Sequence, residues 1–167
     1  MVHPASESDE SLLAKCELTF LRRSGPGGQH RNKTETAVVV EHRPSGLRGE
    51  ASERRSQADN RRLAMIRLRL VLATEVREPF LEGSTTSDLW HSRVKNSRLA
   101  ISADHADFPC LLAEALDCLA ANDFQFDSTA ALLLVTSSQL VKLFKQHRPA
   151  FEMVNRERQV RGLGILK

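Results

Sequence analysis

Alternating apolar and polar residues predict three short β-strands near the start of the chain. Residues 16–22 (CELTFLR) alternate as a strand with one buried face does, and residues 36–42 (TAVVVEH) are rich in β-branched side chains. After the turn Arg43-Pro-Ser-Gly46, residues 47–51 predict a weaker third strand that completes a hairpin. The polar centre of this strand, Arg48-Gly-Glu50, leads us to expect a frayed edge.

From residue 52 onward the apolar residues recur with the period of an α-helix, so the chain changes there from strands to helices. We expect a long helix from about Ser56 to Val76, which Pro79 ends. Its predicted apolar stripe, with arginines on the opposite face, consists of Leu63, Ala64, Ile66, Leu68 and Leu70. The remaining predicted helices cover residues 8–15, 108–122, 128–135, 136–147 and 149–162.

This order of elements predicts an α+β fold, in which a small β-sheet packs on a long basic helix and a small helical subdomain follows. Residues 1–79 form the predicted first domain, residues 80–107 a linker and connecting segment, and residues 108–167 the helical C-terminal subdomain. Within that subdomain, residues 130–144 resemble a helix-turn-helix, because Thr136-Ser-Ser-Gln139 has the capping-box form that opens a second helix. A contact with RNA and a purely structural bundle are both consistent with this pattern.

Positive charge is concentrated in one part of the chain. The net charge is +3, but between Phe20 and Leu70 there are twelve Lys and Arg against five Asp and Glu, an excess of seven. Most of these cations are arginines, whose guanidinium group matches the geometry of phosphate. The chain has no tyrosine and one tryptophan, so we expect no stacking platform for single-stranded nucleic acid there. The expected partner is a folded RNA that is recognised through its backbone and shape, and the alternative is a solvated charged surface.

Cysteines, histidines and hydropathy weigh against several classes of function. Three cysteines, none of them in a C-x-x-C arrangement, indicate a reducing compartment, and six histidines show no metal-ligand spacing. No apolar run is long enough to span a membrane, and the first fifteen residues differ from a signal peptide. We therefore expect a cytoplasmic monomer with no metal and no cofactor, and solvated carboxylates at Glu35, Glu41 and Glu53.

Two segments carry the candidate chemistry. The chain contains Arg23-Ser-Gly-Pro-Gly-Gly-Gln-His-Arg-Asn-Lys-Thr34 between the first two predicted strands. Glu53-Arg-Arg-Ser-Gln57 and Asn60-Arg61 follow at the start of the long helix. In this order and spacing, over residues 18–72, the segments resemble the GGQ domain of class I peptide-chain release factors and related ribosome-rescue hydrolases. A Gly-Gly-Gln tripeptide alone would not distinguish this domain from a flexible surface loop.

The resemblance implies hydrolysis of the peptidyl-tRNA ester on the ribosome, with Gly27, Gly28 and Gln29 as the catalytic residues. Glycine lets the backbone approach closely in a crowded RNA cavity, where a Cβ atom would clash. An amide cannot act as a general base, so Gln29 is expected to place a backbone N–H at the developing oxyanion while its side chain shapes the water pocket. The implied partners are peptidyl-tRNA and the large-subunit rRNA of the peptidyl-transferase centre.

Polar and cationic residues flank the tripeptide and open the long helix, where they can contact an RNA backbone. The predicted RNA-binding residues are Arg23, His30, Arg31, Asn32, Lys33, Arg54, Arg55, Gln57, Asn60, Arg61 and Arg62. Around Gln57 the alternative is helix capping, with Ser52 or Ser56 as the N-cap, and we expect both roles to hold. Arg31 stands where the family usually has an aliphatic residue, so it either adds a phosphate contact or weakens the packing of the loop.

The leading hypothesis is codon-independent peptide release, as in the rescue of stalled ribosomes. Few residues precede the glycine loop, and residues 88–167 do not match the codon-reading domain of full-length release factors, so stop-codon recognition is not expected. The alternative is a non-catalytic RNA- or ribosome-binding module that retains the GGQ fold. The intact tripeptide Gly27-Gly28-Gln29 favours release, because a module that only binds has no need of it.

Overall fold

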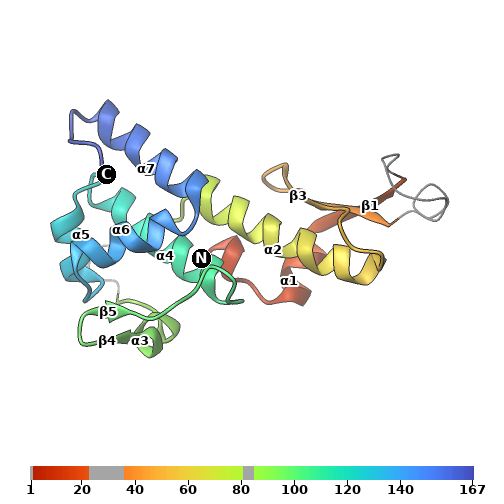
Figure 1. Cartoon of the computed structure of the whole chain (residues 1–167), viewed down its shortest axis with the longest axis horizontal. Helices are drawn as coiled ribbons and strands as arrows, with labels where there is room; N and C mark the ends of the chain where they lie inside the picture. Colours follow the sequence, from red (N-terminus) through yellow and green to blue (C-terminus); the bar gives the residue numbers. More distant parts are fainter. Residues whose placement is uncertain (1, 23–35, 81–84) are drawn as a thin grey trace. The chain divides into compact units, whose positions relative to one another are not determined.

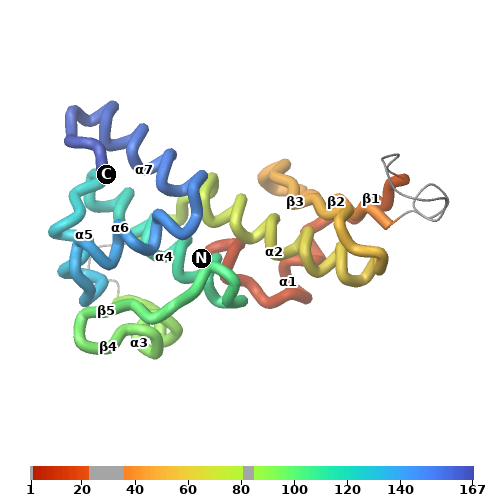
Figure 2. The backbone as a smooth tube through the Cα atoms, in the orientation of Figure 1, coloured from red at the N-terminus to blue at the C-terminus, as the bar shows by residue number. Residues whose placement is uncertain are grey.

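The structure is a computed structural model that describes residues 2–22, 36–80 and 85–167. These residues fall into two compact units, which we call the sheet unit (residues 2–76) and the helical unit (residues 77–167) and describe separately. The sheet unit contains a three-stranded sheet and a long helix, and the helical unit contains five α-helices and a small hairpin among its described residues (Figures 1 and 2). The predicted α+β fold is confirmed.

Three antiparallel strands form the sheet, in the order β1-β2-β3. They are β1 (Cys16–Leu21), β2 (Ala37–His42) and β3 (Leu47–Ala51). In the register of the sheet, Val38 of the central strand lies opposite Phe20 on one side and Ala51 on the other. The β-branched residues of β2 suit this central position, because they pack against neighbours on both sides. All three predicted strands are confirmed.

The long helix α2 (Gln57–Glu75) covers one face of the sheet, as predicted (Figure 1). Ser56, and not Ser52, is its N-cap, because the Ser56 hydroxyl accepts the backbone N–H of Asp59 at 3.3 Å. The helix ends where Val76 takes up an extended conformation, three residues before Pro79.

The face of α2 that packs on the sheet is rotated from the predicted stripe. Buried positions recur at Ala64, Leu68 and Leu72, each of them fully buried, whereas Ile66 is 41% exposed. Apolar residues occur on nearly every side of this helix, so their period does not select one face, and contact with the sheet does. Gly49 of β3 permits the close approach, because a Cβ atom there would lie 2.1 Å from the carbonyl oxygen of Ala64.

Residues of β2 and α2 bind the polar centre of β3 through hydrogen bonds. Arg48, on the outer face, donates to the carboxylate of Glu41 at 2.7 Å, and the carbonyl of Glu50 accepts from Arg67 of α2 at 2.7 Å. The strand pairs with β2 from Leu47 to Ala51. The expected frayed edge is therefore wrong, because neighbouring elements provide the partners that the strand's own sequence lacks.

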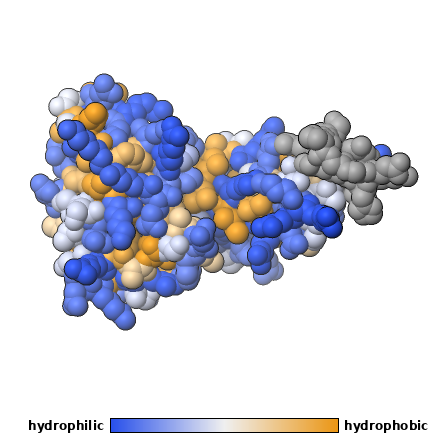
Figure 3. All heavy atoms as spheres, in the orientation of Figure 1, coloured by the Kyte–Doolittle hydropathy of each residue, from blue (hydrophilic) through white to orange (hydrophobic). Residues whose placement is uncertain are grey.

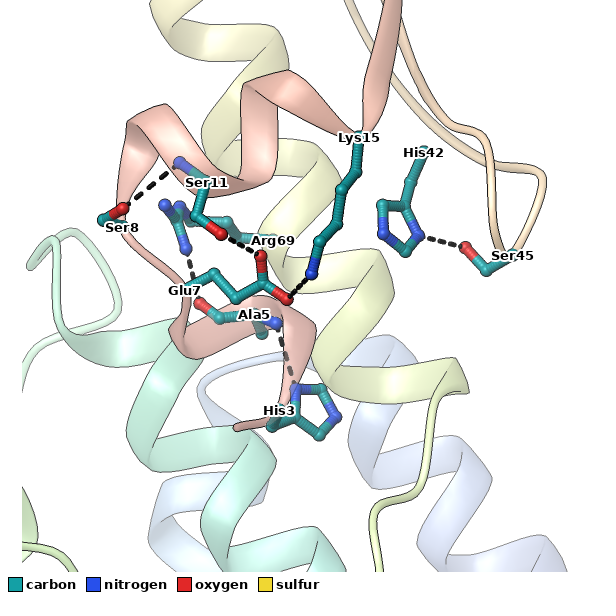
Figure 4. A network of polar contacts seen from close by, with 9 residues as sticks. All are labelled: His3, Ala5, Glu7, Ser8, Ser11, Lys15, His42, Ser45 and Arg69. Atoms are coloured by element: carbon teal, nitrogen blue, oxygen red, sulfur yellow. Dashed lines mark hydrogen bonds and ion pairs between the residues drawn. The ribbon is translucent and has the colours of Figure 1, made fainter. Parts of the chain in front are cut away.

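A buried arginine ties the N-terminal segment to α2. This segment comprises η1 (Pro4–Ser6) and α1 (Asp9–Ala14). The predicted helix start is confirmed, since the Ser8 hydroxyl accepts the backbone N–H of Ser11 at 3.2 Å. Arg69 is 9% exposed and donates to the carbonyl of Ala5 and to the carboxylate of Asp9, both at 2.7 Å. Figure 4 shows the Arg69 guanidinium reaching from α2 toward Ala5, so an arginine that the sequence placed opposite the apolar stripe is structural.

Helices dominate the helical unit. Its elements are α3 (Asp88–Arg93), β4 (Val94–Lys95), β5 (Arg98–Leu99), α4 (Phe108–Ala121), α5 (Phe126–Leu132), α6 (Ser137–Lys145) and α7 (Arg148–Val160). The helices predicted at residues 108–122, 136–147 and 149–162 are confirmed. The helix predicted over residues 128–135 begins two residues earlier and ends sooner, because Leu134 adopts a left-handed conformation with φ 55°. Helix α3 and the β4–β5 hairpin were not predicted.

Aromatic side chains form the centre of the helical unit. Trp90 is fully buried, and its indole N–H donates to the carbonyl of Leu133 at 2.8 Å. The rings of Phe126 and Phe144 meet edge to face, with centroids 5.8 Å apart. Figure 3 shows mainly hydrophilic residues on the visible surface, as expected for units that keep their large apolar side chains inside.

Candidate functional site

The candidate catalytic segment begins and ends at one end of the sheet. Strand β1 finishes at Leu21 and β2 starts at Ala37, and these two residues are directly paired. Eight of the predicted site residues lie outside the described residues: Arg23, Gly27, Gly28, Gln29, His30, Arg31, Asn32 and Lys33. The described site therefore consists of the two ends of this connection and the start of α2.

Asn60 joins the end of the candidate segment to the start of α2. Its side-chain N–H groups donate to the carbonyls of Thr36, at 2.6 Å, and Arg54, at 2.9 Å, and its side-chain oxygen accepts the Arg54 N–H at 2.9 Å. The residue is fully buried. It has no surface left for RNA, so its assignment as an RNA contact is corrected to a positioning role. Its spacing from Ala64 and Leu68, four and eight residues, could have revealed this, because all three share one helical face.

The other described candidates lie exposed in the turn before α2 and in its first two turns. Arg54, Arg55, Gln57, Arg61 and Arg62 are all exposed. Among the described residues, no carboxylate lies within 4.0 Å of any of these four guanidinium groups. The described residues therefore do not neutralise their charge, and an anionic ligand could use it.

A small hollow separates two of these arginines. Arg54 and Arg62 line it together with Asp59, Leu63 and Ile66. Cationic groups beside a short apolar floor suit a phosphate with part of its sugar, and Asp59 lowers the local charge. The predicted stripe placed Ile66 in the core, but Ile66 lines this hollow and is exposed.

Glu53 differs from the solvated carboxylate expected there. It forms an ion pair with Arg67, and it accepts the backbone N–H of Ser52 at 2.8 Å. The Arg67 guanidinium, with help from this N–H, lowers the pKa of Glu53 to about 2. Arg67 is thus neutralised, and the sequence offered no signal for this pair, because fourteen residues separate its members.

The outer face of the sheet carries the opposite charge from the start of α2. Glu17 lies directly opposite Glu41, which in turn lies opposite and pairs with Arg48. Glu50 adds another carboxylate on the same face, since residues two apart on a strand point to the same side. Such a face suits phosphate groups less well than the beginning of α2, where exposed arginines lie.

Two further observations concern metal ions and membranes. Among the described residues, no three His, Cys, Asp or Glu side chains gather where they could share a metal ion. No helix in the described part of the chain is long and apolar enough to cross a membrane.

The chain belongs to the RF-1 domain family, whose model matches residues 12–100. The chain is similar to the chloroplastic peptide chain release factor PrfB1 of Arabidopsis thaliana, with 36% identity over 88 residues, which are 48% of this chain and 19% of the relative. It is also similar to peptide chain release factor 1 of Leptothrix cholodnii, with 43% identity over 76 residues, 44% of this chain and 21% of the relative. The chain thus spans about a fifth of the length of these relatives. The resemblance drawn from the motifs is confirmed at the level of the family.

Proposed function

We propose that this protein hydrolyses the ester bond of peptidyl-tRNA on the ribosome without reading a codon. The observation that carries the proposal is the intact tripeptide Gly27-Gly28-Gln29 between β1 and β2 of an RF-1 domain. Peptide release is what the names of the two relatives indicate for those proteins. Codon independence is supported by the helical unit, of which only residues 77–100 fall within the family match.

The chemistry assigned to the tripeptide follows from the groups it carries. The attacking water must be oriented at the ester carbonyl, and the developing oxyanion needs a hydrogen-bond donor. The backbone N–H of Gln29 is that donor in our proposal, and its side-chain amide, which has no useful pKa, orients the water. The terminal ribose of the tRNA and the rRNA supply the remaining groups. Activity therefore depends on the ribosome, and the protein alone should hardly react.

The arginines at the start of α2 contribute affinity in this proposal. Arg54, Arg55, Arg61 and Arg62 bind rRNA phosphates, supported by their exposure and their lack of carboxylate partners among the described residues. Asn60 of α2 holds Thr36, at the end of the segment between β1 and β2, beside Arg54. The proposed catalytic segment and the proposed binding arginines are therefore joined at the start of one helix.

Release of formyl-methionine from ribosomes tests the proposal. Gly28→Ala should disturb the conformation that places the Gln29 N–H at the oxyanion. The rate at saturating protein should therefore fall by about a hundred- to a thousandfold, the usual effect of losing one oxyanion donor. Gln29→Ala keeps the backbone N–H and should have a smaller effect. Gly164→Ala is the matched control, since a Cβ atom there meets nothing within 4 Å. Ribosome binding, measured by co-sedimentation, should be similar for all four proteins.

The same assay separates the competing functions. Equal release by wild type, Gly28→Ala and Gln29→Ala would show that the tripeptide is not catalytic, and the alternative of a non-catalytic ribosome-binding module would replace the proposal. Release that requires a stop codon in the A site would contradict codon independence and leave the hydrolytic activity in place. Release that is equally fast with and without mRNA in the A site would support both parts.

A further inference from the structure

The helical unit is polarised along the sequence. Residues 77–127 contain four Lys and Arg against nine Asp and Glu, whereas residues 128–167 contain seven against two. The unit as a whole has eleven of each and is neutral, so its positive charge is a local feature of α6, α7 and the C-terminal end. A local excess of this kind creates an attractive potential for anions without any net charge.

Helices α5 and α6 form a helix-turn-helix with a defined turn. Leu134 adopts the left-handed conformation, and the N–H of Val135 donates to the carbonyl of Ala130 at 3.0 Å. The hydroxyl of Thr136 then accepts the N–H of Gln139 at 3.3 Å and caps α6, as the sequence predicted. In proteins that bind nucleic acid with this motif, the second helix faces the ligand.

The two sides of α6 differ in chemistry. Leu140, Leu143 and Phe144 are buried, whereas Ser138, Lys142 and Lys145 are exposed. The exposed residues are spaced by four and three positions, so they lie on one face of the helix. The helix contains no Asp or Glu. Its outer face is therefore a row of hydrogen-bond donors with two positive charges.

The β4–β5 hairpin, whose strand β5 contacts α6, carries two more cations. Lys95 and Arg98 are directly paired across the hairpin, and both are exposed, with Asn96 and Ser97 in left-handed conformations at its tip. Like charges in direct opposition destabilise a hairpin, so this pair is unfavourable without an anion.

These four cations lack carboxylate partners in the described part of the chain, unlike several others in the same unit. Arg93 pairs with Asp107, Arg148 with Glu152, and Arg161 with Glu157. No carboxylate among the described residues lies within 4.0 Å of the charged groups of Lys95, Arg98, Lys142 and Lys145. Lys145 is 5.7 Å from the centroid of the Phe151 ring, a contact that leaves its charge available.

We propose that this hairpin–α6 surface (Lys95, Arg98, Ser138, Lys142 and Lys145) binds the phosphate backbone of a folded RNA. None of these five residues is aromatic, and their amine and guanidinium groups on two elements suit neighbouring phosphates. The choice of RNA over DNA rests on the proposed function, because a ribosomal substrate presents RNA. The helical unit is then a second RNA contact, separate from the arginines of α2.

Binding of free RNA by the full chain tests this inference without ribosomes. A labelled RNA hairpin with a stem of about 16 base pairs is titrated by fluorescence anisotropy at salt concentrations from about 50 to 200 mM. Two double variants, Lys142→Gln with Lys145→Gln and Lys95→Gln with Arg98→Gln, remove charge from the two elements. Arg156→Gln with Lys167→Gln is the matched control, because it removes the same charge from exposed residues outside them.

Each surface variant should weaken binding by about tenfold or more and lower the slope of log affinity against log salt by about two, one for each lost phosphate contact. The control should stay within about twofold of wild type, because its two residues lie outside the hairpin–α6 surface and no phosphate contact of that surface is lost. Affinity and slope equal to wild type in both surface variants would overturn the inference, as would equal losses in the control. Equal affinity for a DNA duplex of the same sequence would overturn the choice of RNA. Because no peptide is released in this assay, loss of release activity with intact RNA binding would contradict only the proposed function.

Discussion

Replacing Gly49 with alanine would place a methyl group inside the contact between β3 and α2. An added Cβ atom would lie 2.1 Å from the carbonyl oxygen of Ala64, 2.5 Å from the backbone nitrogen of Leu68 and 2.9 Å from its Cα. All three are backbone atoms of one helix, so no side-chain rotation can relieve the overlap. Carbon contacts are favourable only near 3.5–4.0 Å, so α2 would have to move away from the sheet by more than about 1 Å.

The size of the effect follows from this geometry. Overpacking a core usually destabilises a protein by about 1–3 kcal/mol, and a clash with helix backbone belongs at or above the upper end of that range. In a domain of this size each 1 kcal/mol lowers the Tm by about 4–8 °C, so Gly49→Ala should lower the Tm of the sheet unit by about 12 °C or more. The strand and the helix also carry Glu50 and Arg67, whose hydrogen bond would be stretched by the same movement.

Thermal unfolding followed by circular dichroism measures this effect. Gly164→Ala is the matched control, since its added Cβ atom meets no atom within 4 Å and its Tm should stay within about 2 °C of wild type. If Gly49→Ala melted as late as this control, β3 and α2 would not be in the close contact described here, and the packing argument would be refuted.

Two further predictions concern buried polar groups. Asn60→Ala leaves the backbone groups of Thr36 and Arg54 unpaired and should lower the free energy of unfolding, measured in urea, by about 2–3 kcal/mol. The control is Arg61→Ala at the exposed neighbouring residue, which should change the free energy of unfolding by less than about 0.5 kcal/mol and weaken only ribosome binding. Equal stability of the two variants would show that Asn60 is not a positioning residue. The free energy of unfolding should fall as pH is lowered from 6.5 toward about 5, because burial holds the pKa of folded His42 below its ordinary value of 6.5 and the unfolded chain therefore binds the proton first. A urea series at several pH values that shows no such loss would contradict the second prediction.

The environment of His42 explains the sign of that pH dependence. Its Nδ1 lies 2.8 Å from the Ser45 hydroxyl, and its Nε2 is buried with no hydrogen-bond partner among the described residues (Figure 4). A protonated ring would need an acceptor at Nε2, so the neutral form is favoured in the folded state. Burial also lowers the pKa of His147, which contributes in the same direction. Glu7, whose pKa is lowered chiefly by its hydrogen bond from Lys15, matters only at more acidic pH, below 4.5.

Local chemistry was sufficient for most boundaries of helices and strands. A run of β-branched residues, a serine or threonine before a helix, and a proline in a first turn act on their immediate neighbours. The caps at Ser8 and Thr136 and the stop at Gly162, which has φ 69°, were therefore predictable. The same signal precedes the short α3, since the Ser87 hydroxyl accepts the N–H of Trp90 and caps that helix, but α3 was not predicted. The β4–β5 hairpin could not be predicted, because strands of two residues contain too few positions for a period to appear, and the hairpin turns on Asn96 and Ser97 without a glycine.

The sequence by itself determined the family, the Gly27-Gly28-Gln29 tripeptide and the concentration of arginine around it, since these depend on which residues follow one another along the chain. Tertiary structure alone decided which of the described arginines are neutralised within the fold. Arg54, Arg61 and Arg62 have no carboxylate partner among the described residues. Arg67 and Arg69 form ion pairs with Glu53 and Asp9 within the fold. The physical reason is that α2 has apolar residues on nearly every side, interspersed with arginines. The sheet that packs on the helix, and not the helix's own periodicity, therefore decides which of its residues face the core and which face solvent.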